Sequence, residues 1–246
     1  MDAGRDRGTL MKSRIFDAEH FPVRSEERWA LQNNRTLRVG LGPDVLAPKG
    51  SMVSFLGQLA FHHEKAGSMG KLAKKVVTGE DVSLMRVSGR GEVFFAQEAG
   101  YVHLLHLENE GVSVNFRNLL AFDSSLTWDI NRVKGAGLMT GGLFNTTIGG
   151  TGTMAVHVVG KPIVLDCSQQ PVHVDRNAAV CWSAGLTPTT HNSMNMGSML
   201  RGGSGEAVQM VFHGPGFVVV QAYEWRPPPA PEKKGGVLGT IGDLIP

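Results

Sequence analysis

The sequence predicts an all-β protein in which three related antiparallel β units pack into one compact, sandwich-like or barrel-like body. Short apolar runs rich in Val, Leu, Ile and Phe recur from about Trp29 onward, each bounded by Gly, Pro, Asn or Asp. Glycine supplies 32 of the 246 residues, which indicates many turns. The third observation is a segment pattern that returns three times. With 41% hydrophobic residues, the chain is able to bury a core.

The elements fall into three regions. Residues 1–28 alternate acids, bases and small residues without an apolar period, so we expect a mobile N-terminal segment. Residues 29–226 form the repeated β domain, and its minor helix is expected at 68–77, where apolar residues recur at helical spacing. The runs expected to be strands are LRVGL, SMVSFLGQLAF, EVFFAQ, YVHLLHLE, VSVNF, TMAVHVV, PIVLDC, VHVD and FVVVQAYEW.

An internal repeat carries the architecture. Residues 112–122 (VSVNFRNLLAF) align without a gap with residues 172–182 (VHVDRNAAVCW), and an earlier copy lies at residues 45–55 (VLAPKGSMVSF). Each copy has apolar residues at period two, a turn-forming Asn, Asp or Pro, and a second apolar segment that ends in an aromatic residue. We therefore expect a strand, a tight turn and another strand in each copy.

The end of the chain, residues 227–246, differs from the β domain. A Pro-rich stretch leads through two lysines and two glycines into VLGTIGDLIP. Such a short segment does not hold a helix alone in water, so we expect it to order only by docking, in cis or in trans. An ordinary frayed terminus is the alternative. The side chains that would share one helix face are Val237, Leu238, Ile241, Leu244 and Ile245.

A candidate basic contact face lies on the expected helix. It consists of Lys71, Lys74 and Lys75, which fall largely on the side opposite the apolar residues. Three interpretations stay open: a solvated helix face, a contact with another protein, and a peripheral contact with anionic lipid. Three lysines are too few for firm membrane attachment.

The histidines do not predict a metal site. His103 and His106 lie three apart on an expected strand, so their side chains point to opposite faces. The adjacent pair His62 and His63 is typical of a polar turn. The remaining histidines of interest alternate with apolar residues and are expected to be outward polar positions of half-buried strands; they are His157, His173 and His213.

No catalytic or cofactor-binding set emerges either. Cys167 ends an apolar strand and Cys181 occupies a small-residue position of the repeat, so both cysteines are expected to be structural. The glycine-rich loop GAGLMTGGLFNTTIGG is followed by strand-like sequence, whereas a phosphate cradle needs a following helix N-terminus. A net charge of +2 and two tyrosines argue against nucleic-acid binding.

Five ordered motifs resemble one known family. They are PKGSMVSFLGQLAF, TGEDVSLMRVSGRGEVFFA, GGLFNTTIGGTGTMAVHVVGKP, VDRNAAVCWSAGL and FHGPGFVVVQ, and they span about residues 30–225. In this order they resemble the altered inheritance of mitochondria protein family, as a bacterial member. The resemblance implies a fold similar to that of the tryptophan RNA-binding attenuation protein, with a tendency to self-assemble, and it implies no enzymatic activity.

The sequence therefore predicts a non-enzymatic scaffold or assembly protein that acts through self-association and protein–protein contacts. A homo-oligomer or a complex with a related chain is expected, because repeated β units leave edges that must be covered or paired. The alternative is a small-ligand or nucleic-acid binding module that uses the glycine-rich loops. The chain lacks the apolar stretch of a signal peptide at its start, so a cytoplasmic location is expected, with no cofactor.

Overall fold

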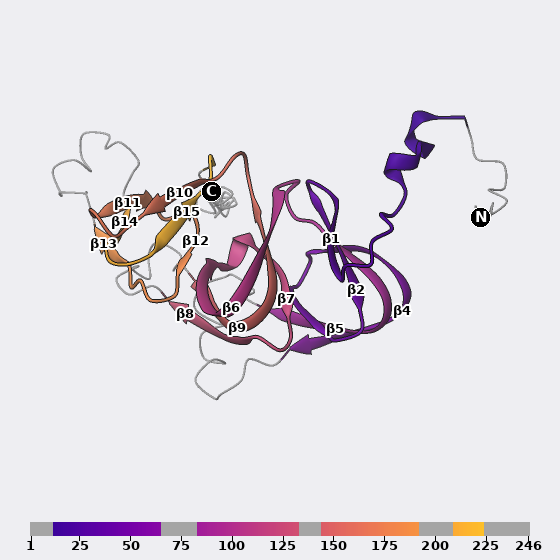
Figure 1. The fold of residues 1–246 in the computed structure, drawn as a ribbon, viewed down its shortest axis with the longest axis horizontal. Helices are drawn as coiled ribbons and strands as arrows, with labels where there is room; N and C mark the ends of the chain where they lie inside the picture. Colours follow the sequence, from indigo (N-terminus) through magenta and orange to yellow (C-terminus); the bar gives the residue numbers. More distant parts are fainter. Residues whose placement is uncertain (1–11, 65–82, 133–143, 192–208, 224–246) are drawn as a thin grey trace, which may run out of the picture.

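The computed structural model describes residues 12–64, 83–132, 144–191 and 209–223, and these are mostly β-strands (Figure 1). The all-β prediction is confirmed. The helix expected at 68–77 lies outside the described residues. The strands are β1 (Trp29–Asn33), β2 (Thr36–Leu41), β3 (Val45–Pro48), β4 (Met52–Glu64), β5 (Leu84–Phe95), β6 (Tyr101–Asn115), β7 (Leu119–Asp123), β8 (Thr127–Arg132), β9 (Phe144–Val158), β10 (Ile163–Asp166), β11 (Val172–Asp175), β12 (Ala179–Ser183), β13 (Thr189–His191), β14 (Gln209–Phe212) and β15 (Phe217–Val220). The described 3₁₀ turns are η1 (Arg14–Phe16), η2 (Ala18–His20) and η4 (Phe116–Asn118).

Most strands belong to one large antiparallel sheet. Its order is β1-β2-β5-β3-β7-β9-β6-β12-β15-β10, with β4 added on β5 and β8 added on β9, and β11-β14-β13 form a second small sheet. Among the described strands β1 and β10 have one partner each, so the large sheet stays open. Figure 1 shows strands β1, β2, β4 and β5 at one end of the molecule and β10 to β15 at the other, with β6, β7 and β9 between them.

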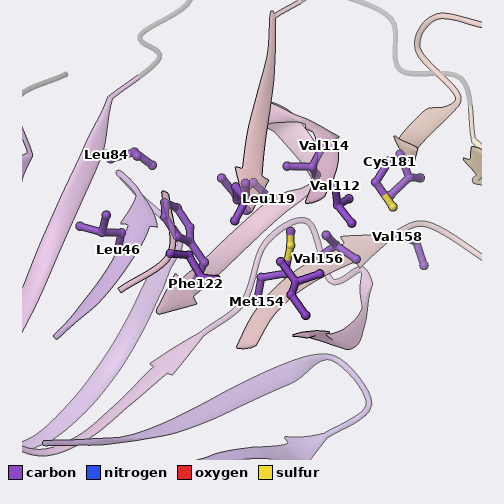
Figure 2. Packing of buried hydrophobic residues seen from close by; sticks show 14 residues of the cluster. Leu46, Leu84, Val112, Val114, Leu119, Phe122, Met154, Val156, Val158 and Cys181 are labelled. Atoms are coloured by element: carbon purple, nitrogen blue, oxygen red, sulfur yellow. The ribbon is translucent and has the colours of Figure 1, made fainter. Parts of the chain in front are cut away.

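Three buried clusters form the core along this length. The central cluster joins the strands β3, β5, β6, β7, β9 and β12, and Figure 2 shows Phe122, Met154 and Leu119 within it. A second cluster lies under β1 to β5. The third fills the C-terminal end, where the ring centroids of Trp182 and Phe212 lie 5.4 Å apart. The apolar residues that alternate along the strands thus form three adjoining hydrophobic cores.

The three segments that share the sequence pattern each contain a strand, a short turn and a second strand. In two of them the turn-forming side chain acts in the same way. Asn115 accepts a hydrogen bond from the backbone N–H of Arg117 (3.2 Å), and Asp175 accepts one from that of Asn177 (2.7 Å). Side chains of this kind favour turns because they satisfy a backbone donor two residues on.

Two expected strands are in fact one. YVHLLHLE and VSVNF both belong to β6, although Glu108, Asn109 and Glu110 between them are polar. Asn109 takes a left-handed backbone conformation (φ +59°) at a bulge in the pairing with β9, and its N–H donates to Thr151 Oγ1 (3.0 Å). Asparagine tolerates this conformation better than most residues, so the strand bends there and continues.

Polar contacts tie the N-terminal end to the middle of the sheet. Arg28 forms an ion pair with Asp123 at the end of β7. The same carboxylate accepts hydrogen bonds from Trp29 Nε1 (3.3 Å) and from the backbone N–H of Thr153 (2.8 Å). Asp123 therefore connects the start of β1 with β7 and β9, because one acceptor-only group serves donors from all three places.

Candidate interaction surface

Strand β4 forms a long exposed edge of the large sheet. It runs from Met52 to Glu64 and, among the described strands, it pairs with β5 alone. One side of its backbone therefore has no strand partner in the described part of the chain. Such an edge is a template for pairing with another chain, because unpaired N–H and C=O groups of a strand can form a further ladder.

The side chains of β4 carry none of the usual protection against pairing. No Lys, Arg, Asp, Glu or Pro occurs from Met52 to His63. Large apolar side chains are instead exposed in the first half of the strand: Val53 is 56% exposed, Phe55 43% and Leu56 48%. Exposed edges of soluble proteins are commonly blunted with charges or proline. An uncharged edge with clustered apolar side chains is typical of an interaction surface.

Glycines bend the hairpin formed by β4 and β5. Gly57 faces Gly91 across the pair, and both take positive φ angles (+100° and +146°). The bend brings the rings of Phe55 and Phe61 together, with centroids 5.3 Å apart, although the two residues lie six positions apart. Phe61 then packs against the N-terminal core. The second half of β4 is anchored in this way, whereas Val53, Phe55 and Leu56 in the first half remain exposed.

An open groove of about 760 Å³ lies beside the exposed first half of β4. Its apolar wall and floor are formed by Val53, Leu56 and the buried Phe94. The N-terminal segment and the β1–β2 turn provide the more polar remainder; the lining residues from these parts are Glu19, His20, Pro22, Gln32, Asn33 and Thr36. We call this cavity, with the exposed half of β4, the β4 groove.

The side chain of Gln32 holds the segment that forms one side of the β4 groove. Its Oε1 accepts a hydrogen bond from the backbone N–H of Val23 (2.8 Å), and its Nε2 donates to the carbonyl of Phe21 (2.9 Å). The sequence predicts a mobile segment over residues 1–28, and it carries no signal for these two bonds. They fix residues 21–23 against β1, so the groove has two defined sides.

A second polar feature lies at the junction between the middle and the C-terminal end. Asn118 Nδ2 donates to the carbonyl of His157 (2.9 Å) and to Gln221 Oε1 (3.0 Å), while Gln221 Nε2 donates to the carbonyl of Asn177 (3.3 Å). We call these four residues the junction cluster. It links η4, β9, the turn before β12 and the end of β15, and the cavity beside it has room for roughly one water molecule.

His157 is the buried titratable group of the junction cluster. It is 2% exposed, and its Nε2 donates to the carbonyl of Arg117 (2.6 Å), while its Nδ1 has no partner in the described part of the chain. Burial lowers the pKa of the imidazole, and this outweighs the opposing effects of that hydrogen bond and of the Glu98 charge. Burial also lowers the pKa of Arg117 to about 10, and the charge of Arg176 adds to the effect. The expectation that His157 points outward is wrong, because elements cover both faces of β9 there.

The comparisons with known proteins agree with this fold. A model of the mitochondrial biogenesis AIM24 family matches residues 29–223. The chain belongs to this family.

Two relatives of this AIM24-family chain come from Streptococcus pyogenes. An uncharacterized protein of serotype M6 is 29% identical over 196 residues, which cover 74% of this chain and 77% of the relative. The crystal structure of an S. pyogenes protein, determined by structural genomics, superposes with a TM-score of 0.62 at 24% identity, covering 80% of this chain and 92% of the other. This likeness shows the fold alone.

Several residues singled out by the sequence lie outside the described part of this AIM24-family chain. They are the apolar tail positions Val237, Leu238, Ile241, Leu244 and Ile245, and the basic positions Lys71, Lys74 and Lys75. The glycine-rich loop is described only from residue 144 onward, where it forms the start of β9. The β4 groove was not predicted, because an apolar run gives no sign of whether its strand lies at an edge.

The remaining expectations concern single side chains. His62 and His63 lie in β4 rather than in a turn, and both are exposed. No group of three His, Cys, Asp or Glu suited to a metal occurs among the residues that the structure describes. Cys167 and Cys181 are buried, and burial raises the pKa of Cys181 to about 12.

No helix in the described ranges is both long and apolar enough to cross a membrane.

Proposed function

We propose that this AIM24-family chain is a non-enzymatic scaffold or assembly protein, and that it associates with a second copy of itself through the exposed half of β4. The observation that carries the proposal is the edge itself: a thirteen-residue strand with one described partner strand, an uncharged stretch from Met52 to His63, and three exposed apolar side chains. Covering this edge would satisfy backbone groups and remove apolar surface from water.

A second copy suits this surface for a physical reason. Because β4 carries no charge before Glu64, two copies of the strand meet without repulsion between like charges. Closed association of identical subunits most often uses the same patch on both of them. The edge at the other end of the sheet is less extensive, since β10 is four residues long. We therefore assign self-association to the β4 end.

The absence of catalysis is part of the proposal. The raised pKa of Cys181 keeps its thiol protonated at neutral pH, and a thiol in that state is a poor nucleophile. His157, the buried histidine of the junction cluster, has its Nε2 hydrogen bonded to a backbone carbonyl, which suits a structural role.

The test compares the intact chain with a charge placed in the apolar patch. We expect the wild-type chain to form an oligomer by native mass spectrometry and light scattering. Leu56→Glu should weaken association by at least tenfold, or about 1.4 kcal/mol, because a carboxylate would be buried without a partner. The matched control is Val164→Glu on β10, at a side chain that is 66% exposed, and it should leave association unchanged.

Two outcomes would overturn this function. One is a wild-type chain that remains monomeric at all accessible concentrations. The other is equal weakening by Leu56→Glu and Val164→Glu. Circular dichroism shows whether each variant keeps its β-structure, and Val53→Glu replaces Leu56→Glu if the latter does not fold.

A further inference from the structure

The β4 groove is suited to a short apolar segment. Its wall and floor are formed by Val53, Leu56 and Phe94, and the acidic residue among its lining residues is Glu19 at the polar side. A cavity of about 760 Å³ is within the size range of sites that bind drug-sized ligands. A charged segment would lose hydration there without gaining an ionic partner on the apolar side.

The C-terminal segment of the chain has the matching chemistry. Residues 237–245 carry five large apolar residues and one charged residue, Asp243. The N-terminal residues 1–11, which precede the other side of the groove, carry four charged residues and are a poorer match. At the spacing of residues 237–245 the apolar side chains would share one helix face, and docking a helix face into an apolar groove is a common mode of recognition.

The length of the tail allows it to reach a groove. Tyr223 is the last described residue, and fourteen residue steps separate it from Val237. At full extension these span about 46 Å. The strand order places β15 seven steps from β4, or roughly 34 Å at the usual strand spacing. Strand β4, which lines the chain's own groove, thus lies toward the opposite end of the sheet from β15 (Figure 1). A neighbouring molecule is free to present its groove closer to the tail.

We infer that residues 237–245 of one copy dock in the β4 groove of a second copy. The inference rests on the proposed function and adds a contact to the pairing of the two β4 strands: the apolar face of Ile241 and Leu244 packs on Val53 and Leu56 of the neighbour. The Pro-rich stretch after Arg226 then acts as the spacer between the β body and the docked segment.

Disulfide trapping between differently tagged full-length chains tests the contact. One chain carries Leu56→Cys and the other Ile241→Cys, and the two are coexpressed and mildly oxidised. The native Cys167 and Cys181 are buried and do not compete. We expect a mixed-chain dimer on a non-reducing gel. The matched control replaces Ile241→Cys with Thr240→Cys, which lies off the apolar face by sequence spacing, and it should give several times less product.

Each other result has a defined meaning. Equal yields from Ile241→Cys and Thr240→Cys would overturn the inference. A chain with both Leu56→Cys and Ile241→Cys that closes only an internal disulfide would show docking in cis and also overturn it. An oligomer that survives deletion of residues 232–246, yet dissociates with Leu56→Glu, would overturn the tail contact and leave the proposed function standing. A monomeric wild type would overturn both. Val53→Cys serves if Leu56→Cys does not fold.

Discussion

The imidazole of His157 is held in its neutral form by its surroundings. Its Nε2 donates to the Arg117 carbonyl, and among the described residues its Nδ1 has no group to which a second proton could be donated. The charged residues around it are Glu98 and Arg117, and the charge of Arg176 acts on Arg117. Burial dominates, so the pKa lies below the ordinary value of 6.5.

The lowered pKa of His157 predicts how the free energy of unfolding depends on pH. Above about pH 6.5 the histidine is neutral in both the folded and the unfolded chain, so it adds no pH dependence. As the pH falls through that value, the unfolded chain binds a proton that the folded chain does not, and the free energy of unfolding decreases until the pH reaches the lowered folded pKa. Urea unfolding at a series of pH values between roughly 7.5 and 5 measures the slope of the free energy of unfolding against pH.

A matched pair of variants isolates the contribution of His157. His157→Gln should unfold more easily at every pH, because it disturbs the junction cluster, and its loss of stability on acidification should be smaller than that of the wild type. His103→Gln, at an exposed position on β6, should keep the wild-type slope. An unchanged slope in His157→Gln would refute the assignment.

The bend of the β4–β5 hairpin depends in particular on the glycine at position 91, where the two paired strands approach each other closely. Gly91 has a φ of +146°, and a Cβ placed on it would overlap the carbonyl oxygen of Leu56 on the paired strand. An L-residue there is strained and also meets backbone that has no room to move. The groove wall that Leu56 forms is therefore positioned by this glycine.

We expect Gly91→Ala to lower the free energy of unfolding by roughly 1–3 kcal/mol or more. The comparison is Gly185→Ala, where nothing lies within 4 Å of the added methyl group. That change should be neutral or slightly stabilising, because it restricts the unfolded chain. Denaturant unfolding of both variants measures the difference in their free energies of unfolding. If Gly91→Ala and Gly185→Ala change this free energy equally, the backbone around Gly91 has room for a side chain.

The sequence predicts strands well and their partners poorly. The short turns after β3, β6 and β11 follow from residues such as Asn115 and Asp175, whose side chains act locally. The position of β4 at an edge depends instead on which distant strands pair with β5, and no local pattern encodes that. The burial of His157 has the same origin: period-two alternation assumes one open face, whereas η4 and Gln221 cover the second face of β9.

At the scale of the whole molecule, polar contacts hold adjoining parts of one open sheet together. Asp123 joins β1, β7 and β9, and the junction cluster joins the middle to the C-terminal end. The N-terminal end differs in the length of its open edge, because β4 is thirteen residues long and has its described pairing on one side only, whereas the edge strand β10 at the other end has four residues. A second molecule that pairs with β4 would extend the large sheet. It would also stabilise the N-terminal end, because it would cover the exposed side chains of β4.

Self-association through β4 therefore predicts that thermal stability depends on protein concentration. If a folded dimer unfolds to separate chains, each tenfold rise in concentration stabilises the dimer by about 1.4 kcal/mol, which is about 0.7 kcal/mol per chain. For a chain of this length that corresponds to a rise in Tm of roughly 1.5–3 °C for each tenfold step, measured by calorimetry over two decades of concentration. Leu56→Glu should lose most of this dependence, since its monomers fold without a partner, whereas Val164→Glu should keep it. A wild-type Tm that is the same across the range would mean that folding and association at β4 are not coupled.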